Sequence, residues 1–327
     1  MKNEHTSIYD FYDLWNSSQN QFMQKNLLLG NGFSCKCWEQ FSYEKIFDNS
    51  PLSTYEKSYF WRCNTKNYET AIGEAENDIT IYELCCDIPD ARYYIGNDIE
   101  NMKLDLITGI SNIHPEKHDL NNTTWNWVIY YISKFNNIFT LNYDNLLYWA
   151  LMDIGNYYND GFSYNSYYDN IWTNRWKNQN IFYLHGANFL FADNNNYTFK
   201  VKATREHSLQ ERIDNYIKLG DIPLSIVEGN YLDKLEKIKN NLYLRFCYNQ
   251  ISNISGLLVI YGVSFNYNDT HIFNAINENM NIKKIYISVY NNDENVIYNA
   301  YNIFKDRINN DSLGLYFYDA DSVRLWT

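Results

Sequence analysis

The chain is 327 residues long and carries a formal net charge of −12, with 45% hydrophobic and 20% charged residues. This length and this balance are those of a globular protein with one large core or two small ones. Because nucleic-acid binding depends on Lys and Arg side chains that neutralise phosphates, the acidic charge argues against a nucleic-acid partner, whereas local amides can still hold a small anion.

The N-terminal part of the chain begins with a predicted helix at 8–22, where apolar residues recur with helical spacing. A short buried strand is expected next, at 27–29. It runs directly into Gly30, Asn31 and Gly32, which predict a tight turn, and a helix is expected to open just after the turn.

The stretch that follows is predicted to be mostly helical or irregular. Its clearest helix covers 123–135, with Thr123 or Thr124 as the N-cap. We interpret residues from about 48 to 120 as a helical insertion within a single domain that spans 1–327, because no Pro-rich or low-complexity segment divides the chain.

From residue 137 onward, short apolar runs alternate with helical patterns. Strands are predicted at 137–142, 180–186, 222–229, 256–262, 283–290 and 313–319. Helices are predicted at 144–152, 206–219, 230–252, 268–279 and 293–309. Strands that alternate with helices pair in parallel through right-handed crossovers, and strands that are apolar throughout suit a sheet covered on both faces. The sequence therefore predicts a doubly wound, mostly parallel, Rossmann-like α/β sheet.

Small and polar residues follow several of the predicted strands. They are Gly30, Asn31, Gly32, Phe33 and Ser34 after the first strand, Asn142 and Asp144 after the second, His185 after the third, and Gly262, Ser264 and Asn268 after the strand at 256–262. In an open parallel sheet, ligands bind beyond the carboxyl ends of the strands. The gathering of these residues at one edge of the sheet predicts a ligand site there.

The glycine loop fits two interpretations. Glycine lets a ligand approach the backbone, and a helix that starts after the loop presents N–H groups to an anion. The dinucleotide motif G-x-G-x-x-G is incomplete, however, because Cys35 takes the place of its third glycine. The loop alone does not decide between a phosphate cradle and a plain connection from strand to helix.

Three of the other residues have candidate chemical roles. Asn142 can orient a water molecule or a ribose hydroxyl. Asp144 is better suited to cap the helix that follows it, since Asp is a favoured N-cap. His185 can act as a general base near neutral pH, although a lone histidine is more often structural. His271, in the first turn of a predicted helix, could come near the same site.

Two further classes of protein are disfavoured. None of the six cysteines forms a C-x-x-C pair, so we expect reduced thiols and no metal site. The first residues lack the pattern of a signal peptide, and the longest apolar run, around 256–265, is about half of the ~20 residues that span a bilayer. We therefore expect a cytoplasmic protein without a membrane partner.

Taken in order, four segments resemble the sirtuin motifs G-A-G-x-S, T-x-N-x-D, L-H-G and G-T-S-L. They are GNGFS (30–34), TLNYD (140–144), YLHG (183–186) and YGVSFN (261–266). The chain is more closely similar to the sirtuin-like proteins of bacterial antiphage defence, in which F-x-Y-x-x-L/I-F follows the glycine loop, E-G precedes a helix that contains a lysine, and G-x-S-x-x-x-N-D comes later. Those motifs are found here at 41–47, at 228–229 with Lys234, and at 262–269, and the similarity extends from about 26 to 290.

This resemblance implies that the protein binds NAD and cleaves the bond between nicotinamide and ribose. It places Gly30, Asn31, Gly32, Phe33 and Ser34 in the cofactor loop, Asp144 in a supporting position, and Gly262, Ser264 and Asn268 on the ribose and phosphate side. It makes Asn142 the residue that orients the attacking water or ribose hydroxyl, and His185 the general base or the hydrogen-bond partner of the ribose.

The chain also departs from the sirtuin pattern. It lacks the four-cysteine zinc module of the deacylases, and Asn31 replaces the alanine of G-A-G. Water is therefore a better acceptor for this protein than an acyl-lysine side chain.

The leading hypothesis from the sequence is an NAD glycohydrolase that releases nicotinamide and ADP-ribose as an abortive-infection effector. The alternative is a module that binds NAD or ADP-ribose without chemistry. An NAD-dependent dehydrogenase is disfavoured by the missing third glycine. Because such a hydrolase destroys the cell's own NAD, the resemblance also implies control by homo-oligomerisation or by a separate sensor subunit. It assigns no role to Glu228 or His271.

Overall fold

The computed structural model describes residues 7–86, 88, 90–155, 157–163, 170–173 and 178–325. Its centre is a seven-stranded sheet with the order β1-β11-β10-β9-β2-β3-β6, in which every neighbouring pair is parallel. The strands are β1 (Ile8–Tyr9), β2 (Lys25–Leu29), β3 (Asn137–Thr140), β6 (Ile181–Tyr183), β9 (Gly256–Tyr261), β10 (Ile282–Val289) and β11 (Gly314–Asp319). The predicted doubly wound α/β fold is confirmed.

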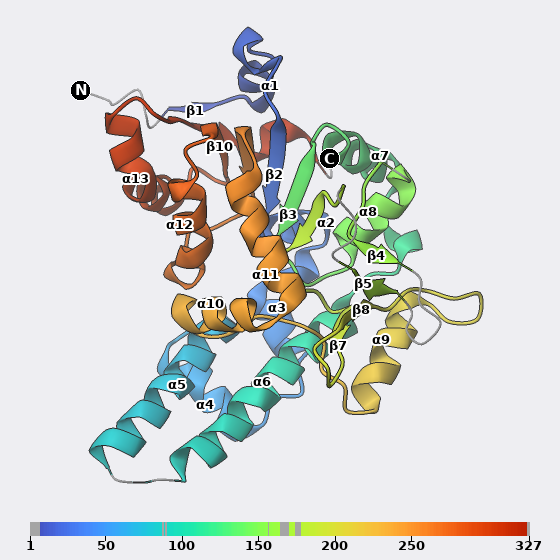
Figure 1. The fold of residues 1–327 in the computed structure, drawn as a ribbon. Coiled ribbons are helices and arrows are strands. Elements are labelled where there is room, and N and C mark those ends of the chain that lie inside the picture. Colours follow the sequence, from blue (N-terminus) through green and yellow to red (C-terminus); the bar gives the residue numbers. More distant parts are fainter. Residues whose placement is uncertain are drawn as a thin grey trace.

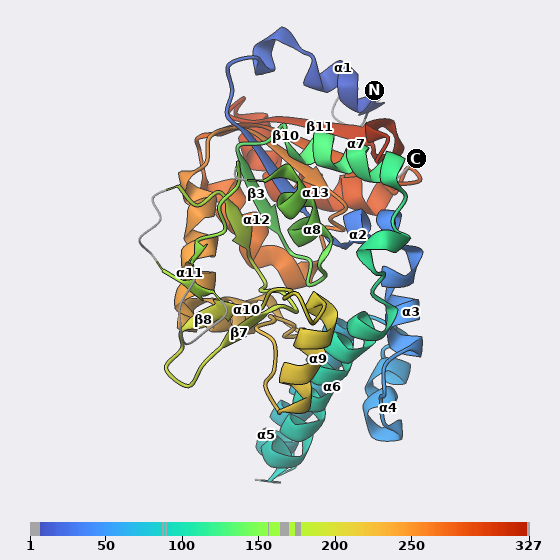
Figure 2. The ribbon, with the colours of Figure 1, turned by 90° about the vertical axis from the view of Figure 1, so that its right-hand side faces the viewer.

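The helices of the described residues connect these strands. They are α1 (Phe11–Trp15), α2 (Asn31–Cys37), α3 (Tyr43–Asp48), α4 (Thr54–Arg62), α5 (Tyr68–Cys85), α6 (Ala91–Ile113), α7 (Asn122–Ile132), α8 (Leu146–Ile154), α9 (Leu209–Lys218), α10 (Tyr231–Asn240), α11 (Leu242–Asn249), α12 (Thr270–Glu278) and α13 (Glu294–Asn309). Helices α11 and α12 lie on one side of the sheet, and α2, α7 and α8 lie on the other (Figures 1 and 2). None of the described helices has both the length and the apolar character that a bilayer crossing requires.

The strand order places a switch point between β2 and β9. Apart from the edge strand β1, the chain builds β2, β3 and β6 outward in one direction and then β9, β10 and β11 outward in the other. β2 and β9 are neighbours, with Leu29 paired to Tyr261 at their carboxyl ends. In open α/β sheets, ligands bind in the crevice at such a reversal. The glycine loop after β2 and the loop after β9 both begin at this place.

The helical part between β2 and β3 forms a projecting unit. Helices α5 and α6 pack against each other and extend away from the sheet, beside α3 and α4 (Figure 1). Buried residues recur every three or four positions on α5, at Ala71, Ile72, Ala75 and Ile79. This spacing gives α5 one apolar face, and that face packs into the core. The base of the unit reaches the carboxyl edge of the sheet.

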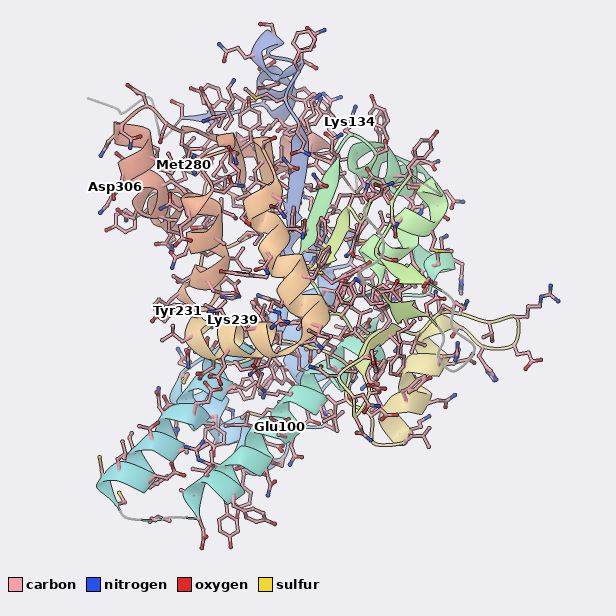
Figure 3. The ribbon with its side chains drawn as sticks, in the orientation of Figure 1. Glu100, Lys134, Tyr231, Lys239, Met280 and Asp306 are labelled. Atoms are coloured by element: carbon pink, nitrogen blue, oxygen red, sulfur yellow. The ribbon has the colours of Figure 1, made fainter. Side chains whose placement is uncertain are left out.

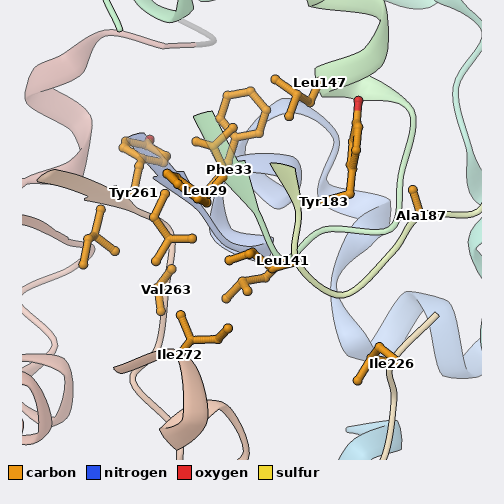
Figure 4. Close-up of a cluster of buried hydrophobic side chains, with 14 of the residues drawn as sticks. Leu29, Phe33, Leu141, Leu147, Tyr183, Ala187, Ile226, Tyr261, Val263 and Ile272 are labelled. Carbon is orange, nitrogen blue, oxygen red and sulfur yellow. The ribbon is translucent and has the colours of Figure 1, made fainter. Parts of the chain in front are cut away.

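An apolar cluster lies directly beneath that edge. Leu29, Leu141, Tyr261 and Val263 come from the ends of β2, β3 and β9, and each is at least nine-tenths buried (Figure 4). Close packing of these side chains leaves little freedom to the loops that follow the strands. The core therefore holds the polar residues after the strands in fixed positions.

A single helix at 8–22 was the wrong prediction. Ile8 and Tyr9 form β1, which pairs with β11 and extends the edge of the sheet. The Asp10 side chain accepts a hydrogen bond from the Tyr12 amide and caps the short helix α1. The helical spacing of apolar residues is thus real only within α1, because the residues before it are held in the sheet.

The predicted strand at 222–229 is also wrong. Only one residue of this segment pairs as a strand would, in an isolated bridge between Ser225 and Gly186. Pro223 has no N–H to donate, which disfavours a ladder here. Ile226 and Val227 are fully buried, so the apolar run reports burial of a loop and not an extended strand.

Three helix boundaries differ from the predicted ones, and in each an Asn or Asp side chain explains the difference. Asn121, not Thr123 or Thr124, caps α7. Helix α8 begins at Leu146 with Asn145 at its N-cap, so the prediction of Asp144 as the cap is wrong by one residue, although Asp144 Oδ1 accepts a hydrogen bond from the Leu146 amide. The predicted helix 230–252 is divided at Asn241, whose side chain accepts a hydrogen bond from the Leu244 amide and starts α11.

A second, antiparallel sheet was not predicted. It comprises β4 (Phe162–Ser163), β5 (Ile171–Trp172), β8 (Thr198–Lys200) and β7 (Leu190–Ala192), in that order. These strands have two or three residues each, which is too short for an alternating pattern to stand out in the sequence. The sheet lies beside α9 and away from the switch point (Figure 1).

Candidate functional site

A cavity of about 630 Å³ lies at the carboxyl edge of the parallel sheet. Residues that follow β2, β3, β6, β9 and β10 line it on one side, and Tyr43, Ile46, Glu69, Leu106 and Ile110 of the projecting helical unit line it on the other. Its volume falls within the range of about 300–1,000 Å³ that is usual for small-molecule sites. The helical unit is thus a wall of the cavity and not a separate appendage.

Most of the residues predicted from the strand ends line this cavity. Those that do are Gly30, Asn31, Gly32, Asn142, Asp144, His185, Gly262 and Ser264. Phe33 and Ser34 are buried behind its wall, at 1% and 0% exposure. Asn268 also lies outside the lining and donates a 3.5 Å hydrogen bond from Nδ2 to Glu69. The structure therefore brings together eight of the eleven predicted residues around one space and puts the other three next to it.

The glycines are explained by the close packing of two loops. The Gly30 amide donates to Tyr261 O and the Gly32 amide to Gly262 O, both at 2.9 Å. A Cβ atom on Gly32 would lie 2.7 Å from Gly262 Cα, and Gly262 itself has φ +72°. Two N–H groups of the glycine loop are therefore already bonded within the protein. The plain connection accounts for these glycines, although their backbones still face the cavity.

Asn142 is held by a chain of hydrogen bonds that starts at a carboxylate. Ser34 Oγ donates to Asp144 Oδ2 at 2.5 Å, so its oxygen can only accept from Asn142. Asn142 Nδ2 donates to Ser34 Oγ at 2.9 Å and to Gly30 O at 3.0 Å. Both N–H bonds of the amide are committed, and the atom left for the cavity is the carbonyl oxygen Oδ1. Asn142 thus presents an acceptor, which can orient a water molecule or a hydroxyl.

His185 follows β6 and lies next to a second buried histidine. Its Nε2 is 3.2 Å from His271 Nε2 on α12, and the two side chains are 2% and 1% exposed. Burial lowers the pKa of His185 well below its usual value, and Lys234 adds to this; burial also lowers the pKa of His271, to about 4. Both imidazoles are therefore neutral near pH 7, so the shared contact is a hydrogen bond from one ring N–H to the other ring's lone pair.

A buried ion cluster completes the wall beside the histidines. Lys234 Nζ, on α10, lies 2.8 Å from Glu69 Oε1 and 2.9 Å from Asp269 Oδ1, and the lysine is fully buried. Burial raises the pKa of Glu69 although Lys234 opposes it. Burial acts in the same direction on Asp269, but the Lys234 ammonium outweighs it and the pKa of Asp269 is lowered.

The sequence motifs contained only part of this cluster. Lys234 and Asp269 lie within segments that resemble known motifs, whereas Glu69 comes from α5 and carries no local signal. The sequence predicts no role for Glu228. It is 2% exposed, pairs with Lys103 at 3.0 Å and with Lys237 at 2.6 Å, and does not line the cavity.

His185, Asp269 and His271 could in principle hold a metal ion, because one ligand atom from each lies within 4.8 Å of the others. The Lys234 ammonium, however, is 2.9 Å from the same Asp269 carboxylate. A divalent cation bound there would be placed against this buried positive charge. The donor set therefore does not favour a metal.

Asp144 also bears on hydride-transfer chemistry. In dinucleotide-binding folds of that kind, an acidic residue after a neighbouring strand binds the ribose hydroxyls. Asp144 follows β3, which neighbours β2, but its two oxygens accept hydrogen bonds from Ser34 Oγ and the Leu146 amide. The carboxylate at this place is used to hold Ser34 and α8.

Residues 27–326 match the family described as "Domain of unknown function (DUF4917)", and the chain belongs to that family. No curated protein matches the sequence. The family description names no activity.

Proposed function

We propose that the protein is an NAD glycohydrolase. The observation that carries this proposal is the meeting of Asn142 and His185 in one cavity at the switch point of a Rossmann-like sheet. Asn142 offers a fixed acceptor that can orient a water molecule, and His185 offers a neutral imidazole that can accept a hydrogen bond or a proton. The proposal adds no metal and no covalent intermediate.

The proposed reaction consumes one water. The bond between ribose C1′ and the nicotinamide nitrogen breaks, and its electron pair neutralises the pyridinium ring. The water oxygen bonds to C1′, and the products are nicotinamide, ADP-ribose and one proton. Because nicotinamide leaves as a neutral molecule, no strong acid is needed. Orientation of the water by Asn142 and a low-dielectric site supply the acceleration.

The residues that line the cavity match the nicotinamide ring of NAD better than its pyrophosphate. Leu106, Ile110 and Ile46 offer an apolar wall to a flat ring, and the carboxylates of Glu69 and Asp269 suit a positive charge. Lys36 is the one cationic side chain among the described lining residues, and it pairs with Asp321 at 2.6 Å. The pyrophosphate would therefore depend largely on hydroxyl and backbone donors.

The resemblance to sirtuin-like proteins of antiphage defence supports the same proposal. The segments that carry it, around Gly30, Asn142, His185 and Gly262, contribute side chains or backbone to the cavity. By this resemblance the protein acts in the cytoplasm as an abortive-infection effector. Control by a separate sensor subunit or by homo-oligomerisation belongs to the same proposal, and native mass measurement with and without candidate partners tests it.

The test of the activity is direct. Purified protein, alone and with candidate activating partners, is incubated with NAD, and released nicotinamide is measured. We expect Asn142→Ala and His185→Ala to lower the rate by about 10²-fold or more. His118→Ala is the matched control, since the His118 side chain is 83% exposed and does not line the cavity.

Calorimetry on the same samples separates the two candidate functions. Binding of NAD without any release of nicotinamide would replace the hydrolase by the nucleotide-sensing module. Full activity in both site variants would contradict the roles assigned to Asn142 and His185.

A further inference from the structure

Two carboxylates share one ammonium at the wall of the cavity. Glu69 and Asp269 both line the cavity, and their side chains are 19% and 18% exposed. Lys234, which pairs with both, is fully buried and does not line it. A ligand in the cavity therefore meets the carboxylates first and the lysine only behind them.

The cluster holds two carboxyl groups and one ammonium, and the adjacent His185 and His271 are neutral. Burial raises the pKa of Glu69, so the cluster carries a net negative charge when the pH is above that raised pKa. Among the described residues, no second cation pairs with either carboxylate. In that ionised state the wall carries a negative charge on partly buried carboxylates, where Coulomb interactions are stronger than in bulk water.

A second observation points to a ligand in the same cavity. Asn142 is 8% exposed and lines the same cavity, and its Oδ1 has no hydrogen-bond partner among the described residues. His185, which also lines it, has Nε2 3.8 Å from Asp269 Oδ1. Asn142 Oδ1 is an acceptor at the cavity wall to which a water molecule or a ligand can donate a hydrogen bond. The carboxylates and this acceptor therefore serve the same occupant.

We propose that Glu69 and Asp269 form a subsite for a positively charged ring, and that this subsite makes the protein select NAD⁺ over NADH. The inference rests on the proposed function, because it takes the nicotinamide end of NAD⁺ as the occupant. The two dinucleotides share their ribose, pyrophosphate and adenine parts. They differ at the nicotinamide, which is an aromatic cation in NAD⁺ and a neutral dihydropyridine in NADH, so a charged wall favours NAD⁺.

The same cluster also joins three elements, because Glu69 lies on α5, Lys234 on α10 and Asp269 just before α12. A purely stabilising role, in which the cluster only holds these three elements together, explains the ion pairs. It does not explain why both carboxylates border the cavity while the lysine is buried behind them. A purely stabilising role also predicts that ligand binding does not depend on the charge of the ligand, whereas a charged subsite predicts that it does, and a binding measurement distinguishes the two.

The experiment compares the binding of NAD⁺ and NADH by calorimetry in the Asn142→Ala protein, in which the proposed hydrolysis is slowed. We expect NAD⁺ to bind at least about tenfold more tightly than NADH. Glu69→Gln, added to the same protein, should bring this ratio close to one, and Glu69→Asp should restore part of it. Glu44→Gln changes the net charge equally at an exposed position outside the cavity and should leave the ratio unchanged.

The possible outcomes test the charged subsite and the hydrolase activity separately. Equal binding of the two dinucleotides, with nicotinamide released by the wild type, would contradict the charged subsite alone. Tight and selective binding of NAD⁺ without nicotinamide release would support the subsite and contradict the hydrolase. No binding of either dinucleotide would contradict both. If Glu69→Gln does not fold, Glu69→Asp takes its place, and equal binding of the two dinucleotides in the Asn142→Ala protein alone would still contradict the subsite.

Discussion

Ser34 Oγ lies 2.5 Å from Asp144 Oδ2, although 110 residues separate the two in the chain. Both side chains are at least nine-tenths buried. Because the carboxylate can only accept, this contact sets the direction of every hydrogen bond that follows it, through Ser34 to the amide of Asn142. Ser34 and Asp144 therefore decide which atom of Asn142 faces the cavity.

Removal of the Ser34 hydroxyl should free Asn142 to turn. In Ser34→Ala, Asp144 Oδ2 loses its donor and one N–H of Asn142 loses its acceptor. We expect the free energy of unfolding to fall by about 1–3 kcal/mol and nicotinamide release to fall at least tenfold, with a smaller change in KM. Urea unfolding and steady-state kinetics measure the two effects.

Ser252→Ala is the control for this change, because the Ser252 hydroxyl lies on the surface and bonds only to Asn249 O. It should alter neither quantity. Asp144→Asn gives a sharper variant, since an amide at 144 can donate to Ser34 and so reverse the chain of hydrogen bonds. Full activity in Ser34→Ala would contradict the positioning of Asn142 by Ser34.

The packing of the two loops at the switch point predicts a severe effect of a single methyl group. In Gly262→Ala the new Cβ would lie 2.4 Å from the Phe33 amide nitrogen, and the residue would keep φ near +72°. Both the clash and the backbone conformation are unfavourable, so we expect a loss of at least about 2 kcal/mol in the free energy of unfolding.

Gly96→Ala is the same substitution at a position where we expect it to stabilise the protein. Gly96 lies within α6, and an added Cβ would meet no atom within 4 Å. Alanine favours the helix, so this variant should be more stable by about 0.5–1 kcal/mol. Thermal and urea unfolding of the two variants beside the wild type test both signs, and equal effects of the two changes would contradict the packing argument.

The sequence could predict those site residues that come directly after the apolar run of a buried strand. Asn142 and His185 each follow an apolar run, and in a parallel sheet all such ends meet at one edge. Which side chain faces the cavity could not be predicted in the same way. Ser34 lies in the loop as expected, but its side chain points behind the wall, because the direction depends on Asp144 from another strand end.

Glu69 lay beyond the reach of sequence patterns for a different reason. It is one of several acidic residues of α5, and only the packing of that helix against α10 brings it to Lys234. In the segment 222–229 the sequence pattern is present, but the predicted strand is not. Its apolar run correctly reports burial, but burial alone does not distinguish a strand from a loop that is covered by other elements.

Lys234 should be more important for folding than any exposed lysine. In Lys234→Met, the carboxylates of Glu69 and Asp269 would remain buried without their shared cation. We expect a loss of about 3–5 kcal/mol at pH 7. The loss should shrink as the pH falls, because protonation of the carboxylates relieves their repulsion. Urea unfolding between pH 5 and pH 8 measures both effects.

Lys239→Met is the matched control. Lys239 lies on the same helix, α10, and its side chain is exposed (Figure 3). This substitution removes the same charge from a solvated position, where the effect is usually within about 0.5 kcal/mol. A loss of similar size in both variants would show that the buried ion cluster contributes nothing of its own.

Glu76, on α5, should make stability depend on pH near neutrality. Its Oε2 is buried without a hydrogen-bond partner among the described residues. Burial, together with the nearby Asp233 and Glu228 carboxylates, raises its pKa from 4.5 to about 7. Folding therefore favours the protonated form. The stability that this group contributes is fully present below pH 4.5 and is lost as the pH rises through 7.

Glu76→Gln keeps the shape of the protonated acid and removes its titration. At pH 5 the variant should be more stable than the wild type by less than about 1 kcal/mol, and at pH 8 by about 3 kcal/mol. Urea unfolding at both pH values gives the difference, in which the contributions of all other groups cancel. Glu44→Gln, at an exposed position, should show no such divergence. Parallel stability profiles of Glu76→Gln and the wild type would contradict the raised pKa, because a group with an ordinary pKa is ionised in the folded and unfolded protein alike over this range.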